Sequence, residues 1–256
     1  MERIANFTIG WWFTPAARHV FRREIRNYFN TPIGYVFAVT CLLLNFLLFF
    51  TGMPGITPDF WSARAASIRS YMVMLPLTFI LLVPAISMRL WAEERRSGTI
   101  ELLSTLPMTD FEIVIGKFMA AWAMVSGIIL ASLPLTFSIA LIGPLAWGET
   151  FTLYLGSILM AGAYVSMGML ISALTREQIV AFILILLASA VMFLGHYFII
   201  TRGLPESVAR FVGFFSHSYH FQSFSRGILD LGDLIYFTAF MGLMLAANIW
   251  VLRRAR

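Results

Sequence analysis

Long runs of apolar residues, separated by short polar segments, make up most of the sequence. Six runs come close to the roughly 20 residues that a helix needs to cross the hydrocarbon core of a bilayer. They cover residues 33–50, 71–88, 118–142, 153–174, 179–200 and 234–252, and none of the charged residues falls inside them. The pattern predicts an all-α integral membrane protein with six transmembrane helices, forming a single transmembrane domain over residues 1–256.

Capping residues and prolines mark where these helices begin and bend. Asn30 or Thr31 can cap the first span, and Pro32 then stands at the first helical position, where its missing N–H costs nothing. Membrane helices tolerate internal prolines when neighbouring groups satisfy the freed backbone. We therefore expect kinks in the second and third spans, at Pro76, Pro84 and Pro134.

Composition excludes a soluble enzyme. Hydrophobic residues make up 59% of the chain and charged residues 12%, about half the charge of a typical soluble domain. The mean hydropathy is +0.82. The net charge of +5 could suggest a nucleic-acid partner, but the basic residues flank the apolar runs, so we expect lipid contact and no nucleic acid.

The distribution of basic residues predicts an orientation. If the N-terminus is cytoplasmic, thirteen basic residues lie on the cytoplasmic side and five on the other. Basic residues concentrate on the cytoplasmic side of membrane proteins. We therefore expect both termini in the cytoplasm, which agrees with an even number of spans.

Three of the four segments outside the spans predict short helices near the membrane surface. Residues 12–29 form an amphipathic pattern, with Ala17 and Val20 on an apolar face and Arg18 and Arg22 on another. Residues 59–70 predict a short outer helix that leads into the second span. The long outer segment 201–233 is rich in phenylalanine, and we expect two short helices there, dipping into the membrane interface.

The fourth segment, the inner loop 89–117, carries the richest local signals. It opens with a charged turn at 93–96 and a break at Gly98, after which Thr99 can cap a short helix that Pro107 ends. Thr109 or Asp110 can begin the next helix. This loop could receive force from a soluble partner; the alternative is an ordinary positively charged cytoplasmic loop.

Most catalytic and nucleotide-binding motifs are missing. Gly116-Lys117 is the only Gly-Lys pair and Phe118 follows it, so the chain holds no P-loop. The sequence has no H-E-x-x-H and no G-x-S-x-G motif, and its single cysteine, Cys41, cannot form a disulfide within the chain. We predict neither enzymatic activity nor a cofactor.

Two alternatives remain open from the residues alone. One is a membrane-embedded metal-dependent enzyme whose outer face uses His196, His217 and His220 with Asp230 or Asp233. We favour interfacial histidines in an aromatic-rich segment over this metal site. The other alternative is a membrane anchor that carries no substrate.

The fourth span is rich in small residues, which allow helices to approach closely. Ser157 and Ala161, Gly162 and Ser166, and Gly168 and Ser172 form pairs with small-xxx-small spacing. We expect them to serve packing within one chain rather than a dimer interface.

Several motifs resemble those of the ABC type-2 permease family, and more narrowly of gliding-motility-type permeases. The inner loop carries the most specific of these motifs, at residues 88–103 (MRLWAEERRSGTIELL), 106–107 (LP) and 115–118 (IGKF). Further matching motifs are 23–36 (REIRNYFNTPIGYV), 174–178 (LTREQ) and 220–230 (HFQSFSRGILD). The resemblance covers nearly the whole chain.

The resemblance implies a bacterial cytoplasmic (inner) membrane permease with an N-terminal elbow helix and re-entrant helices between spans five and six. Between spans two and three it implies a cytoplasmic coupling helix that docks on a dimer of ABC ATPase subunits. A second permease chain completes the transporter, and gliding-motility-type systems add an accessory extracytoplasmic subunit. ATP hydrolysis in the partner would then drive export or force transmission. The residues that the resemblance assigns to ATPase coupling are Glu93, Glu94, Arg95, Arg96, Gly98, Thr99 and Glu101.

Overall fold

The computed structural model describes residues 14–54, 57–63, 66–98, 108–202, 208 and 213–254. The predicted short helix after Thr99, with Glu101, lies outside these residues, as do the first two residues of the predicted amphipathic segment. The described part of the chain is helical and has no strand, only an isolated bridge between Met53 and Thr57. The helices are α1 (Pro15–Asn30), α2 (Pro32–Thr51), α3 (Phe60–Ala63), α4 (Arg69–Ser87), α5 (Ala92–Arg96), α7 (Asp110–Leu130), α8 (Leu133–Ile142), α9 (Trp147–Leu174), α10 (Gln178–Arg202), α12 (His217–Ser225) and α13 (Leu231–Arg254).

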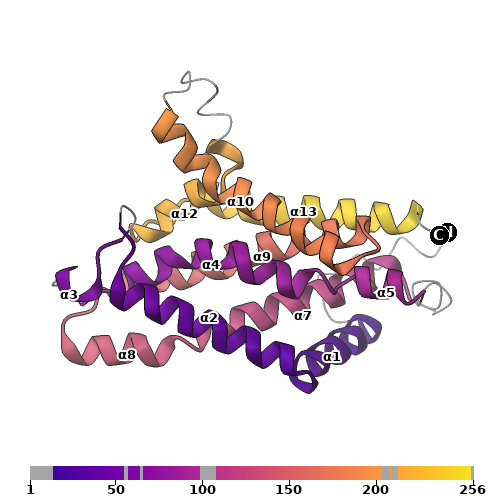
Figure 1. Ribbon diagram of the computed structural model, residues 1–256, viewed down its shortest axis with the longest axis horizontal. Helices are drawn as coiled ribbons and strands as arrows, with labels where there is room; N and C mark the ends of the chain where they lie inside the picture. The colour runs from indigo at the N-terminus through magenta and orange to yellow at the C-terminus, as the bar shows by residue number, and fades with distance from the viewer. Residues whose placement is uncertain are drawn as a thin grey trace.

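Within the described residues, six helical segments are long and apolar enough to cross a membrane, which confirms the predicted number of spans. They are Gly34–Thr51, Arg69–Arg96, Asp110–Ile142, Trp147–Leu174, Gln178–Gly195 and Leu231–Arg254. Figure 1 shows them running along the long axis of the molecule. One end carries α1, α5 and the C-terminus and is called the α5 end; the other carries α3 and is called the α3 end.

Helix α9 is the centre of the bundle. It contacts α4, α7, α10, α12 and α13, and most of its length is buried. Two of its glycines lie against these neighbours: an added Cβ would be 2.5 Å from Phe224 at Gly156 and 2.6 Å from the Ser87 Cβ at Gly168. The small residues of this span therefore serve packing within the chain, as expected.

The third spanning segment is broken into α7 and α8 just before Pro134. At the break, Ser132 Oγ lies 2.7 Å from the Ile129 carbonyl oxygen and 2.8 Å from the Tyr154 hydroxyl. The same hydroxyl lies 2.8 Å from Thr136 Oγ1. Ser132 thus gives a partner to a carbonyl at the end of α7, as an interrupted helix needs in an apolar surrounding, and Tyr154 of α9 joins Ser132 to Thr136 in α8. Helix α4 is continuous through Pro76 and Pro84.

Each peripheral helix buries one face against the bundle and exposes the opposite face on the surface of the molecule. On α2, Phe37, Cys41, Asn45 and Phe49 recur at four-residue spacing and are buried, whereas Leu43 is 62% exposed. The amide of Asn45 donates to Thr78 Oγ1 on α4 at 3.1 Å and to the Cys41 carbonyl at 2.8 Å. Exposed apolar side chains on α2, α10 and α13 give these helices a surface suited to lipid.

Candidate functional site

A cluster of four charged side chains is packed into the α5 end of the bundle. Lys117 on α7 is at its centre, with a side chain only 3% exposed. Its Nζ lies 3.2 Å from Glu24 Oε1 on α1 and 2.9 Å from Glu94 Oε1 on α5. Arg23 also lies within ion-pair distance of both carboxylates, at 2.8 Å from Glu24 and 3.5 Å from Glu94. We call Arg23, Glu24, Glu94 and Lys117 the buried charge cluster, in which Arg23 forms the solvent-facing edge with a side chain 51% exposed.

The contacts of Lys117 account for all three of its N–H donors. Besides the two carboxylates, Nζ donates to the Leu90 carbonyl at 2.9 Å, and it lies 5.0 Å from the centroid of the Trp91 ring. A buried ammonium is costly unless it is fully paired and hydrogen-bonded. Lys117 meets that condition only while α1, α5 and the turn at Leu90 all stay in place, so the cluster joins three segments into one unit.

A close approach of two helices brings Glu24 to Lys117. Next to Lys117, an added Cβ at Gly116 would lie 2.8 Å from the Val20 Cβ and 3.0 Å from the Ala17 carbonyl oxygen. Ala17, Val20 and Glu24 form the buried face of α1, at the three- and four-residue spacing of one helix face. Gly116 therefore lets α1 pack directly on α7, with Glu24 opposite the lysine.

Burial and charge act against each other on the Glu24 carboxyl. Burial alone raises its pKa, but the nearby Lys117 and Arg23 outweigh that effect and leave the pKa below its ordinary value. Glu24 is therefore ionised at neutral pH. The cluster holds two cations and two anions, so its charges balance within the protein.

Ser172 near the end of α9 holds the start of α5 from the other side. Its Oγ accepts hydrogen bonds from the backbone N–H groups of Trp91 and Ala92, both at 3.1 Å, and donates to the Met88 carbonyl at 2.9 Å. Trp91 beside it is buried, with 1% of its surface exposed. Ala92 packs on Ala181 of α10. Helix α5 is thus fixed to the central helix α9, to α10 and, through the cluster, to α1 and α7.

The start of α7 is also fixed at this end. Thr109 accepts from the Glu112 N–H at 3.3 Å while the Glu112 carboxylate accepts from the Thr109 N–H at 2.9 Å, which makes a capping box. This confirms the predicted helix start at Thr109. Asp110 lies 3.7 Å from Arg253 of α13. The start of α7 is therefore fixed both by its own cap and by α13.

The structure separates the residues that the resemblance grouped for ATPase coupling. Glu93, Arg96 and Gly98 are exposed, and Gly98 has a φ of +69° with no neighbouring atom within 4 Å of an added Cβ. Arg95 is half-buried. Glu94 points inward to the buried charge cluster instead of outward. Thr99 and Glu101 lie outside the described residues.

Lys117, Glu24, Arg23 and Ser172 were not among the predicted site residues, although the structure places them around α5. One signal for Glu24 was available, since it follows Val20 by four positions on the apolar face of an amphipathic helix. Lys117 is the only lysine of the chain. Both are polar residues on otherwise apolar faces, which is the pattern of a buried ion pair.

His217 and His220, whose side chains the structure describes, do not form the metal site that the sequence left open. The His220 Nε2 lies 3.0 Å from the Phe214 carbonyl, which can only accept, and its Nδ1 lies 2.6 Å from Asp233 Oδ1. Both ring nitrogens are therefore engaged with protein groups. The Asp230 carboxylate accepts from the Gly232 N–H. No group of three or more potential ligands occurs among the described residues, and the His196 side chain is outside them.

His217 has a packing role beside this pair. Its Nδ1 lies 2.9 Å from the Tyr236 hydroxyl, which itself donates to the Phe215 carbonyl, so Nδ1 carries the proton. Burial lowers the pKa of His217 to about 3, with a smaller contribution from His220, and the ring is neutral. The ring also packs edge-on against Tyr164 of α9. These contacts favour the interpretation of His217 and His220 as packing residues in an aromatic-rich segment over their interpretation as metal ligands.

A comparison with protein families matches residues 56–214 to a family described as ABC-2 family transporter protein. The match spans more than half of the chain, from the segment before α3 to the segment before α12. It therefore includes α5, α7 and the whole of α9. A search of curated proteins found no match.

Proposed function

Because the chain belongs to the ABC-2 family of transporter proteins, we propose that it is the membrane permease on which a separate ATPase docks at the α5 end. The buried charge cluster carries this proposal. The exposed side chains of α5 and the undescribed segment after it form the docking surface. The cluster is the connection that passes a displacement of α5 on to α1 and α7.

The contacts of α5 lead to three other helices, α7, α1 and α9. Pushing α5 along the bundle axis moves Glu94 against Lys117 on α7, and Lys117 in turn holds Glu24 on α1. Ser172 transmits the same movement to α9, which contacts five other helices. Breaking any of these contacts leaves a buried charge or a buried N–H without a partner, so the helices favour moving together. This is the property that a coupling element needs.

In the proposed assembly, the α5 end faces the cytoplasm and both termini lie there, in agreement with the thirteen-to-five distribution of basic residues. Helix α1 is the elbow helix, and α12 belongs to the re-entrant region between the last two spans. A second permease chain pairs with this one, and an ATPase dimer binds the two α5 ends. ATP binding then shifts the permease between two states by favouring one of them, for export or for transmission of force.

Co-purification tests the docking surface. The tagged chain is co-expressed with the ATPase encoded beside it, and compared with the variants Arg96→Glu and Glu93→Arg, which reverse exposed charges on α5. Arg26→Glu is the matched control, because Arg26 is exposed on α1 and its substitution makes the same charge reversal as Arg96→Glu. We expect the ATPase to elute with wild type and with the control, and to be lost with the α5 variants.

Two results would count against the proposal. Retention of the ATPase by both α5 variants would place the docking surface elsewhere. Absence of the ATPase from a well-folded wild-type sample would favour an anchor that carries no substrate. An ATPase with a disabled catalytic site provides the complementary test, since an anchor would keep its function with that partner and a permease would lose it.

A further inference from the structure

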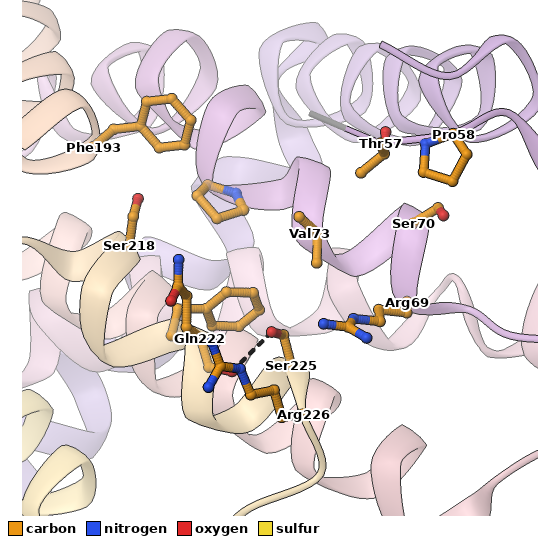
Figure 2. A pocket seen from close by; sticks show the side chains of 12 residues that line it. Thr57, Pro58, Arg69, Ser70, Val73, Phe193, Ser218, Gln222, Ser225 and Arg226 are labelled. Atoms are coloured by element: carbon orange, nitrogen blue, oxygen red, sulfur yellow. Dashed lines mark hydrogen bonds between the residues drawn. The ribbon is translucent and has the colours of Figure 1, made fainter. Parts of the chain in front are cut away.

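A polar cavity lies at the α3 end of the molecule, far from the buried charge cluster. It has a volume of about 410 Å³ and is bounded by the segment before α3, the first turns of α4, α10 and helix α12. Two arginines line it, Arg69 at the start of α4 and Arg226 directly after α12. Figure 2 shows the Arg69 side chain extending toward α12, where Ser225 lies between it and Arg226.

The two guanidinium groups are short of partners within the protein. Arg226 forms no side-chain hydrogen bond or ion pair with any residue that the structure describes. The one acidic neighbour of Arg69 in the described chain is Glu149, whose carboxylate is 4.0 Å from Arg69 Nε, at the limit of an ion pair. No carboxylate is among the described residues that line the cavity. Both residues are exposed, and the Arg69 side chain is 51% exposed, so solvent screens part of their mutual repulsion. An anion between the two cations would lower this repulsion further.

The rest of the lining is divided between polar and apolar residues. Ser70, Gln222 and Ser225 stand near the arginines, whereas Val73, Phe193 and Phe221 supply an apolar wall. A cavity of this volume is in the range that holds a small molecule, not merely an ion. Its chemistry matches a ligand with an anionic group at one side and an apolar body at the other.

We propose that this cavity binds the phosphate group of an amphipathic ligand, with Arg69 and Arg226 holding the phosphate oxygens. A single carboxylate is satisfied by one guanidinium fork, whereas a phosphate ester offers charged oxygens to two. The apolar wall takes the adjoining chain. Both a phospholipid and a soluble phosphate ester carry this chemistry, and the experiment separates them.

Binding is measured on the full purified chain in a neutral detergent, by the shift of its melting temperature with added ligand. The probes are dihexanoyl phosphatidylglycerol, dihexanoylglycerol without phosphate, glycerol phosphate without acyl chains, and hexanoate as a carboxylate. We expect the phosphate-bearing probes to raise the melting temperature of wild type. If the phosphatidylglycerol alone does so, the ligand is a lipid; if glycerol phosphate is equally effective, it is a soluble ester.

Three variants and a control locate the effect. Arg226→Gln and Arg69→Gln should each weaken binding on the order of 10- to 100-fold, the loss expected for one charge-assisted contact. Arg226→Lys keeps the positive charge but not the two-pronged guanidinium, so its affinity should fall between those of the glutamine variants and wild type. This variant keeps the test possible if a neutral variant fails to fold. Arg26→Gln removes an exposed arginine from the opposite end and should bind as wild type does.

Three outcomes would overturn the proposal: no phosphate compound stabilises wild type, dihexanoylglycerol or hexanoate binds as tightly as the phosphates, or folded Arg69 and Arg226 variants keep wild-type affinity. The measurement needs no ATPase. A failure here therefore leaves the docking proposal intact, and a failure of docking leaves this one intact.

Discussion

Lys117 Nζ and Glu24 Oε1 lie 3.2 Å apart although 93 positions separate the two residues in the chain. The pair joins the amphipathic helix α1 to the spanning helix α7, and Glu94 adds α5 to it. In water such pairs contribute little, but here the lysine is buried and each partner offsets the cost of burying the other. The free energy of this contact is therefore linked to the position of three helices at the surface where we propose that the ATPase binds.

Lys117→Met is expected to lower the free energy of unfolding by about 3–5 kcal/mol, because it leaves the partly buried Glu24 and Glu94 without their central cation. Titration with a denaturing detergent, followed by circular dichroism, measures the loss. The triple variant that adds Glu24→Gln and Glu94→Gln removes the unpaired charges and should recover part of it. A loss below about 1 kcal/mol in Lys117→Met would mean that the cluster is solvated and does not join the helices.

The stability of the chain should depend on pH through Glu24. Its pKa is lower in the folded protein than the ordinary value of 4.5, so its ionised form stabilises the fold at pH values above 4.5. This contribution is lost as the pH falls through the lower, folded pKa. Melting temperatures between about pH 7 and about pH 3 should therefore decrease more steeply for wild type than for Glu24→Gln.

Glu93→Gln is the control for the substitution itself, because it makes the same Glu-to-Gln change at an exposed position on α5, outside the buried charge cluster. Identical slopes for wild type and Glu24→Gln would show that Glu24 does not carry the effect.

The spans could be predicted from the sequence because crossing a bilayer imposes a length and an apolar composition that are visible locally. The start of α7 was equally local, since a capping box needs only Thr109 and Glu112, three residues apart. The break before Pro134 was indicated by the proline, but its partner Tyr154, on the next helix, was not. Each of these successes depends on residues of one continuous stretch of the sequence.

The charge cluster and the arginine cavity could not be predicted because their members come from different helices. In the sequence, Arg69 lies in the predicted outer helix 59–70 and Arg226 in the motif 220–230, and nothing showed that both line one cavity. Glu94 follows Glu93 directly, yet a helix turns neighbouring residues to different directions, so one carboxylate faces Lys117 and the other is exposed. Such contacts depend on how the helices pack, which hydropathy alone does not determine.

Gly116→Ala should loosen the contact between α1 and α7, because its Cβ would lie 2.8 Å from the Val20 Cβ. We expect a loss of about 1–3 kcal/mol in stability, typical of an overpacked contact. Limited trypsin digestion measures it directly, since α1 carries exposed Arg22 and Arg26, and cleavage there should become faster.

Gly127→Ala is the matched control, because Gly127 lies on the same helix and an added Cβ there meets nothing within 4 Å. Its digestion rate should equal that of wild type. Equal rates for both alanine variants would show that α1 does not depend on this close approach.

Ser172→Ala removes the shared acceptor of the Trp91 and Ala92 N–H groups and leaves both buried donors unsatisfied. A cost of about 2 kcal/mol is expected in the free energy of unfolding. Ser166→Ala is the control on the same helix, because the Ser166 hydroxyl donates to the Ala163 carbonyl of its own helix and is buried in the same way. The Ser172 variant should still bind the ATPase, because the exposed face of α5 is unchanged. If α5 passes its movement to α9 through Ser172, this variant should nevertheless stimulate ATP hydrolysis less than the Ser166 variant does. Equal stimulation by the two variants, together with a confirmed loss of stability in Ser172→Ala, would restrict Ser172 to a structural role and direct the search for the coupling path to the charge cluster alone.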